Sequence, residues 1–145
     1  MNLEGRFFDA AAMVSRVQEA RRQLLAEVKA AEESGQKERA ERANDALEGY
    51  YIFEDQLDAL DPEEWKRTDA AEIVERVMVS REQLVVAIED AIDQRHPGDA
   101  ARLRRKLQGF DFVAESLDLL DDREWERRML SERIVSILSL PWKEA

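Results

Sequence analysis

The chain has 145 residues, the length of one ordinary domain, and carries 33 acidic against 22 basic residues, a net charge of −11. This charge disfavours a general binder of nucleic acid or of anionic membranes and favours cationic or mixed partners. Cysteine is absent, which excludes disulfides, thiolate metal sites and cysteine catalysis. No apolar window approaches the ~20 residues of a membrane span, and the first residues do not resemble a signal peptide. We therefore expect a cytoplasmic protein that does not contact a membrane.

The first part of the chain predicts two antiparallel helices. Apolar side chains recur at alternating steps of three and four over residues 14–31 and again over residues 43–60. Asp9 is placed to cap the first helix, and a glycine-containing turn separates it from the second. This pairing places Arg21 opposite Gly49. A glycine inside a helix costs about 1 kcal/mol relative to alanine, and we interpret it as room for the arginine stem.

The hexapeptide LDPEEW ends this first hairpin. Asp61 suits a helix N-cap, Pro62 suits the first helical position, and Glu64 stands where a capping box requires an acid. Leu60 and Trp65 occupy the two positions of a hydrophobic staple. We interpret the hexapeptide as a structural joint that redirects the chain, with a ligand-stacking role for its tryptophan as the alternative.

Residues 68–127 repeat residues 8–67 without a gap, and 21 of the 60 aligned positions are identical. The identities fall in clusters, as in DAAAMVSRV and DAAEIVERV, which favours duplication over shared composition. The hexapeptide LDDREW repeats the joint. Its matching residues are Leu120, Asp121, Glu124 and Trp125. We interpret the two units as an internal duplication of one helical hairpin.

The second unit predicts helices over residues 74–91 and 103–120, separated by the turn HPGD. Here Arg81 stands opposite Gly109, as in the first unit. An arginine on an apolar seam needs a carboxylate, because an unpaired buried charge is costly. Three candidates for this carboxylate are Glu48, Asp58 and Asp118.

Residues 128–145 include LSERIVSIL, which resembles the start of a third unit and predicts a C-terminal helix over 131–140. Repeat arrays generally need three or more units. We therefore predict that residues 1–145 form one all-α domain. The predicted architecture is an internally duplicated, four-helix bundle-like fold with short connecting helices and the C-terminal helix packed over it. Solenoid-like stacking and a homodimer that completes the burial are the alternatives.

Two acidic stretches, at residues 54–64 and 111–124, stand out as candidate surfaces. Carboxylates along a helix face imitate the phosphate rows of a duplex or attract a basic partner. A solvated face that keeps a helical protein in solution is the plainer interpretation. The candidate partner-binding carboxylates are Asp55, Asp58, Asp111, Glu115 and Asp118.

Two further stretches are candidates for binding a partner. The basic run RLRRK contains Arg102, Arg104 and Arg105, which suit an acidic partner or an acidic stretch of a second copy. The segment GYYIF holds more aromatic surface than one helix face buries. Tyr51 and Ile52 are therefore expected to turn outward, either against the other hairpin or as an apolar partner site.

One set of acids resembles a known metal site. The set comprises Glu72, Glu75, Glu89, Asp90 and Asp93. It resembles the ExxE and ExxD pairs of the all-helical MazG-type nucleoside triphosphate pyrophosphohydrolases, and the resemblance implies magnesium held by acids from facing helices. Here both pairs lie on one predicted helix, roughly 20 Å apart at about 1.5 Å per residue, and they depart from the family's spacing. One chain alone would not hold an ion between them.

No convergent polar site emerges from the sequence. His96, the only histidine, precedes a proline at a turn, where it complements a helix dipole. We therefore predict no catalytic residue, metal or cofactor, and a non-catalytic helical protein-interaction module that acts as an adaptor, assembly chaperone or inhibitor. An acidic DNA mimic or counter-defence inhibitor is one alternative, and a metal-dependent all-α hydrolase of MazG type is another. A protein partner is expected, without direct contact to nucleic acid.

Overall fold

The computed structural model describes residues 9–57, 61–117, 123, 124 and 127. This part of the chain is all-helical, with four long helices and one short helix. The helices are α1 (Ala10–Glu33), α2 (Lys37–Leu57), α3 (Pro62–Arg67), α4 (Ala70–Asp93) and α5 (Pro97–Ser116). None of these helices is both long and apolar enough to cross a membrane. The expected C-terminal helix over 131–140 lies outside the described residues.

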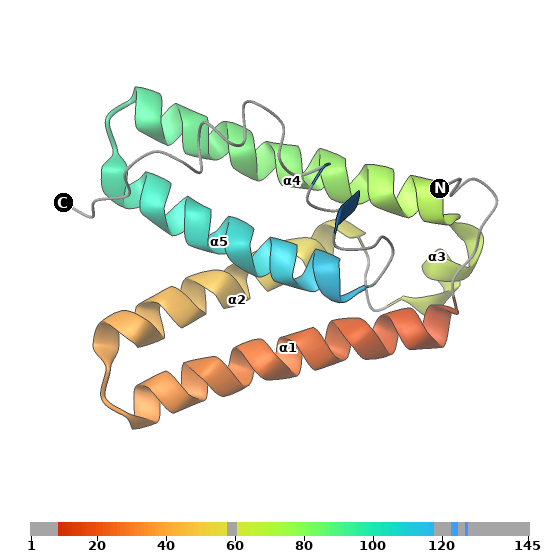
Figure 1. The fold of residues 1–145 in the computed structure, drawn as a ribbon, viewed down its shortest axis with the longest axis horizontal. Coiled ribbons are helices and arrows are strands. Elements are labelled where there is room, and N and C mark those ends of the chain that lie inside the picture. Colours follow the sequence, from red (N-terminus) through yellow and green to blue (C-terminus); the bar gives the residue numbers. More distant parts are fainter. Residues whose placement is uncertain (1–8, 58–60, 118–122, 125–126, 128–145) are drawn as a thin grey trace.

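Two helical hairpins, α1–α2 and α4–α5, pack together like a bundle with both turns at the same end (Figure 1). The most extensive contact between any two helices is that of α2 with α5. Helices α1 and α4 flank this central pair on opposite sides (Figure 1). At the end away from the turns, the short α3 joins the hairpins and contacts α1.

The two hairpins begin with the same kind of cap. The Asp9 side chain accepts hydrogen bonds from the first-turn amides of α1, the shorter from Ala11 N at 2.9 Å. The Asp69 side chain accepts one from Glu72 N, also at 2.9 Å. An N-cap acid satisfies amides that have no partner within the helix and favours its positive end. Consequently α1 and α4 start at corresponding positions, sixty residues apart.

The two hairpin turns also share one backbone conformation. Gly35 and Arg95 both lie in the left-handed region, with φ of 71° and 59°. The next amide bonds back into the helix: Gln36 N donates to Ala31 O, and His96 N donates to the corresponding carbonyl of α4. This is the Schellman ending, for which glycine is the usual residue. Arg95 adopts the same left-handed conformation although it is not a glycine, so the second turn keeps the Schellman ending.

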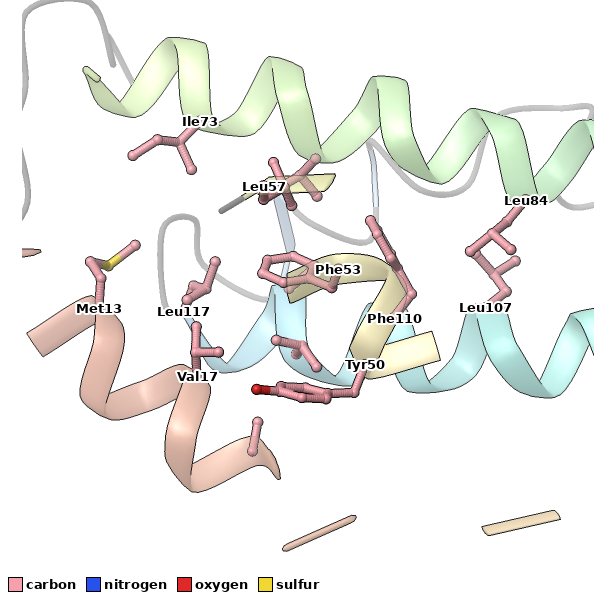
Figure 2. Packing of buried hydrophobic residues seen from close by; sticks show 14 of the residues in the cluster. Met13, Val17, Tyr50, Phe53, Leu57, Ile73, Leu84, Leu107, Phe110 and Leu117 are labelled. Atoms are coloured by element: carbon pink, nitrogen blue, oxygen red, sulfur yellow. The ribbon is translucent and has the colours of Figure 1, made fainter. Parts of the chain in front are cut away.

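The core gathers apolar side chains from all five helices. At its centre, Phe53 of α2 packs edge-on against Phe110 of α5, with ring centroids 5.2 Å apart and planes at 62° (Figure 2). Leu84 of α4 points toward Leu107 of α5 in the same view (Figure 2). Full burial of a large apolar side chain contributes roughly 1.5–3 kcal/mol, so this cluster supplies most of the stabilisation.

Helices α2 and α5 approach each other closely at two glycines. A Cβ atom at Gly49 would lie 1.9 Å from the carbonyl oxygen of Lys106, and one at Gly109 would lie 1.9 Å from that of Ala46. The glycines therefore make room for the backbone of the opposite hairpin and not, as the sequence suggested, for an arginine stem. The two contacts are equivalent, because each maps onto the other when residue numbers shift by sixty.

Candidate functional site

A buried ion pair joins α4 to α5. Arg81 is 2 % exposed, and its Nε and Nη2 donate to the two carboxylate oxygens of Asp111 at 2.8 and 2.9 Å. Burial raises the pKa of the Asp111 carboxyl above its ordinary value, while the guanidinium opposes that shift. The carboxylate that pairs with the arginine is thus Asp111, which was not among the three predicted candidates. Asp111 itself holds the helices together, although the sequence had suggested it for partner binding.

Of the three carboxylates predicted for Arg81, only Glu48 belongs to the described residues. Glu48 of α2 pairs with Lys106 of α5 at 3.0 Å. Asp58 and Asp118 lie outside the described residues. Which carboxylate pairs with the guanidinium depends on which residue of α5 lies beside it. The sixty-residue spacing of the two units does not determine that residue.

The corresponding arginine of the first hairpin behaves differently. Arg21 is exposed, so its prediction as a seam residue is not met. Where the second hairpin has an aspartate, the first has Tyr51, which is 42 % exposed. The neighbouring Tyr50 is buried, and its hydroxyl donates to Glu54. Without a carboxylate opposite it, burial of this guanidinium would leave a charge uncompensated, which accounts for its outward position.

The basic run on α5 is divided between the interior and the surface. Nε of Arg105 donates to Asp45 Oδ2 of α2 at 2.8 Å, and this pair is mostly buried. Arg105 therefore serves the contact between the hairpins, in contrast to its predicted partner-binding role. Arg104 is half-buried, and Arg102 is exposed. Only the last of the three presents its charge fully to solvent.

A shallow groove of about 370 Å³ lies beside the turn of the second hairpin. Its lining mixes acids and bases, among them Asp90, Asp99, Arg102 and Lys106. The His96 ring nitrogen Nδ1 lies 3.3 Å from Asp99 Oδ2. Charges of both signs at this rim leave no excess of one sign to select an ion.

The acids that resemble a pyrophosphohydrolase site all lie on α4. They are Glu72, Glu75, Glu89, Asp90 and Asp93. Within the described part of the chain, no three His, Asp or Glu side chains gather so that they would hold a metal ion. The single-helix placement follows the periodicity of the sequence.

The structure describes residues 61–65 of the first hexapeptide, LDPEEW, which lies between the hairpins. Asp61 is the N-cap of α3, its side chain accepts from Glu63 N at 3.0 Å, and Trp65 is 4 % exposed. Glu64 departs from the expected capping box, because its carboxylate accepts from Arg76 Nη1 at 3.0 Å. This ion pair ties α3 to α4.

The remaining joint residues are mostly beyond the described segments. Leu60, Leu120, Asp121 and Trp125 all lie outside them. Glu124 is described and forms an ion pair with Arg127. The staple between the leucine and the tryptophan therefore stays a prediction.

The predicted surface residues differ in how far they reach solvent. Ile52 is half-buried and packs against the core, so the outward position predicted for it is only partly reached. Tyr51, Asp55 and Glu115 are exposed. The sequence did not single out two further exposed apolar residues, Val79 and Val86 of α4. Their separation of seven residues, two helical turns, was the available signal.

Comparisons of the chain with protein families, with curated proteins and with solved structures found no match. Within the described residues, the large apolar side chains more than a third exposed are Leu25 (40 %), Tyr51 (42 %), Val79 (53 %), Val86 (40 %) and Phe112 (37 %). They are distributed over all four long helices and are the candidate contact residues.

Proposed function

We propose that this chain is a non-catalytic helical interaction module that binds another protein through its helix surfaces. The observation that carries the proposal is the set of exposed apolar side chains, which reaches 53 % exposure at Val79. Exposed apolar side chains lose their contact with water when a partner covers them, and aromatic side chains often contribute most of the binding energy. The buried polar groups at Arg81 and Arg105 are instead used to hold the helices together.

We further propose that the scaffold arose by duplication of a helical hairpin, residues 8–67 and 68–127, within one domain spanning 1–145. Support comes from the common start of α1 and α4, from the shared turn conformation and from the equivalent glycine contacts. A duplicated scaffold offers two equivalent frameworks, of which one is free to diverge into a binding surface.

The test is affinity capture from the native host at low salt, with chemical cross-linking and mass spectrometry. The wild-type chain is compared with a variant in which the exposed apolar residues become serine. The substitutions are Leu25→Ser, Tyr51→Ser, Val79→Ser, Val86→Ser and Phe112→Ser. We expect a stoichiometric partner that the variant loses while its unfolding temperature stays close to that of the wild type.

Two results would contradict this proposal. One is a partner that the serine variant retains in full, since the exposed apolar residues would then not carry the interaction. The other is magnesium-dependent turnover of nucleoside triphosphates by the purified chain, because that would make the protein an enzyme. A control variant with Gln18→Ala and Gln23→Ala changes exposed polar residues of α1 and should retain the partner.

A further inference from the structure

The outer face of α4 carries two apolar side chains that the core does not use. Val79 is 53 % exposed and Val86 is 40 % exposed. Residues seven apart in a helix lie two turns apart on the same face. The valines therefore form a short apolar stripe about 10 Å long at about 1.5 Å per residue. At about 100° per residue, Glu75, Gln83 and Asp90 lie within about 50° of the line midway between the two valines.

Acidic side chains of α4 flank this stripe. The exposed acids of α4 include Glu75, Asp90 and Asp93. Of the two basic residues of α4, Arg81 is buried with its carboxylate partner. Nearer the start of the helix, Arg76 is engaged by acids on α3 and α4. Both basic groups of α4 are thus paired within the molecule, and the exposed residues of α4 include acids but no base.

The same face of α1 shows that the fold does not require this pattern. Sixty residues earlier, the positions of the two valines are occupied by Glu19 and Ala26. Glu19 forms an ion pair with Arg22, and Lys29 lies 3.9 Å from an acid one turn further on. The face of α1 is therefore a solvated surface of alternating charge. The face of α4 differs from it in both apolar content and charge balance.

Resting on the proposed function, we propose that the outer face of α4 is the docking site of a basic amphipathic helix from another protein. Apolar residues of the partner would cover Val79 and Val86, and its lysines or arginines would meet the acids on either side. Helix recognition of this kind uses anchors spaced by three, four and seven residues. A second copy does not suit this face, because the chain carries a net charge of −11 and paired copies would bring the same acids together.

The test uses a fluorescein-labelled helical peptide of leucine and lysine as the probe, titrated with the full chain in fluorescence anisotropy. The substituted chain carries Val79→Gln and Val86→Ala, which remove the apolar anchors without changing the charge of the face. We expect this variant to bind the peptide about tenfold more weakly or worse. Raising the salt to about 0.5 M should weaken wild-type binding, since the rim charges are screened.

Matched controls separate docking from general attraction to an acidic protein. Gln18→Ala on α1 and Gln108→Ala on α5 change exposed side chains elsewhere and should leave the affinity unchanged. A peptide of leucine and glutamate should not bind. Shifts in the amide NMR spectrum on adding the lysine peptide should concentrate on α4. Since both valines are more than a third exposed, and glutamine and alanine favour helix, the α4 variant should keep the wild-type unfolding temperature.

The inference is overturned if the α4 variant binds the peptide as tightly as the wild type, or if the spectral shifts concentrate on another helix. It is also overturned if ultracentrifugation finds a dimer of the wild type that the α4 variant loses, because the occupant would then be a second copy. The proposed function stands independently if the five-residue serine variant loses its captured partner while the α4 variant keeps it. Both fail if neither variant changes capture.

Discussion

The α1–α2 and α4–α5 hairpins share caps, turns and outer-helix lengths but differ in what their outer helices bury. In α4, Arg81 and Val85 are almost fully buried, at 2 % and 1 % exposure. At the corresponding positions of α1, Arg21 and Leu25 are exposed. The two hairpins share caps and turns but thus bury different residues of their outer helices. The shared features are local to each helix end, whereas the differences depend on what each helix meets.

One position explains why the two arginines diverge. The second hairpin offers Asp111, and the first offers Tyr51 in its place. A guanidinium leaves water only when a carboxylate compensates it, since an isolated buried charge costs several kcal/mol. The residue on the neighbouring helix therefore decides whether the arginine at this position is buried in the core.

The largest expected effect comes from removing that partner. Asp111→Asn leaves the buried guanidinium of Arg81 without its counter-charge and should lower the free energy of unfolding by about 3–5 kcal/mol. The matched change Tyr51→Asn, at an exposed position, should cost less than about 1 kcal/mol. Urea denaturation followed by circular dichroism measures both. Equal losses in the two hairpins would show that the ion pair is not what distinguishes them.

A double variant makes the same comparison sharper. Replacing both partners, with Arg81→Met and Asp111→Leu, removes the charges together and should restore most of the stability lost in the single variant. If the double variant is as unstable as Asp111→Asn, packing around the pair, and not its charge, is responsible.

The next largest effect tests the feature that the hairpins share. Gly49→Ala and Gly109→Ala each place a methyl group against the opposite backbone and should destabilise by about 1–3 kcal/mol, despite the gain in helix propensity. Because the two contacts are equivalent, the losses should be similar. Gly98→Ala is the control, since nothing lies within 4 Å of a Cβ there. Thermal unfolding of the three variants checks this, and tolerance at one of the two crossing glycines would break the symmetry.

Local structure was predictable because its signals are local. An apolar period of three to four, an aspartate before it and a turn with glycine or proline after it predicted helices close to α1 and α4, and Asp61 and Pro62 predicted the start of α3. Each such signal acts within one or two turns of the residue that carries it. The assignment of an all-helical bundle therefore needed no knowledge of how helices cross.

Contacts between the hairpins were not predictable in the same way. Counting residues outward from a turn predicts which positions face each other within one hairpin. Gly49 and Gly109, however, lie where α2 crosses α5, and Arg105 binds across the same contact. The angle and offset at which two helices cross follow from packing of the whole core. The exposed position of Val79 likewise depends on which side of α4 the other helices cover.

A smaller effect is expected at the two helix caps. Asp9→Ala and Asp69→Ala each remove an acceptor for first-turn amides and should cost about 1 kcal/mol. Asparagine at either position should retain most of the stability, because it caps nearly as well. Differential scanning calorimetry checks both pairs. A cap that matters in only one hairpin would indicate that tertiary packing supports the other helix start.

The smallest effect tests whether the ion pair of the second hairpin can be transplanted into the first. Tyr51→Asp places a carboxylate at the position of the first hairpin that corresponds in sequence to Asp111. The new pair would form at the surface, where water and salt screen it, so the unfolding free energy should change by less than about 1 kcal/mol. Urea denaturation at low and high salt measures the change and its screening. A gain of several kcal/mol that survives high salt would mean that the α1–α2 hairpin buries its arginine once a carboxylate is supplied, and that one residue separates the two hairpins.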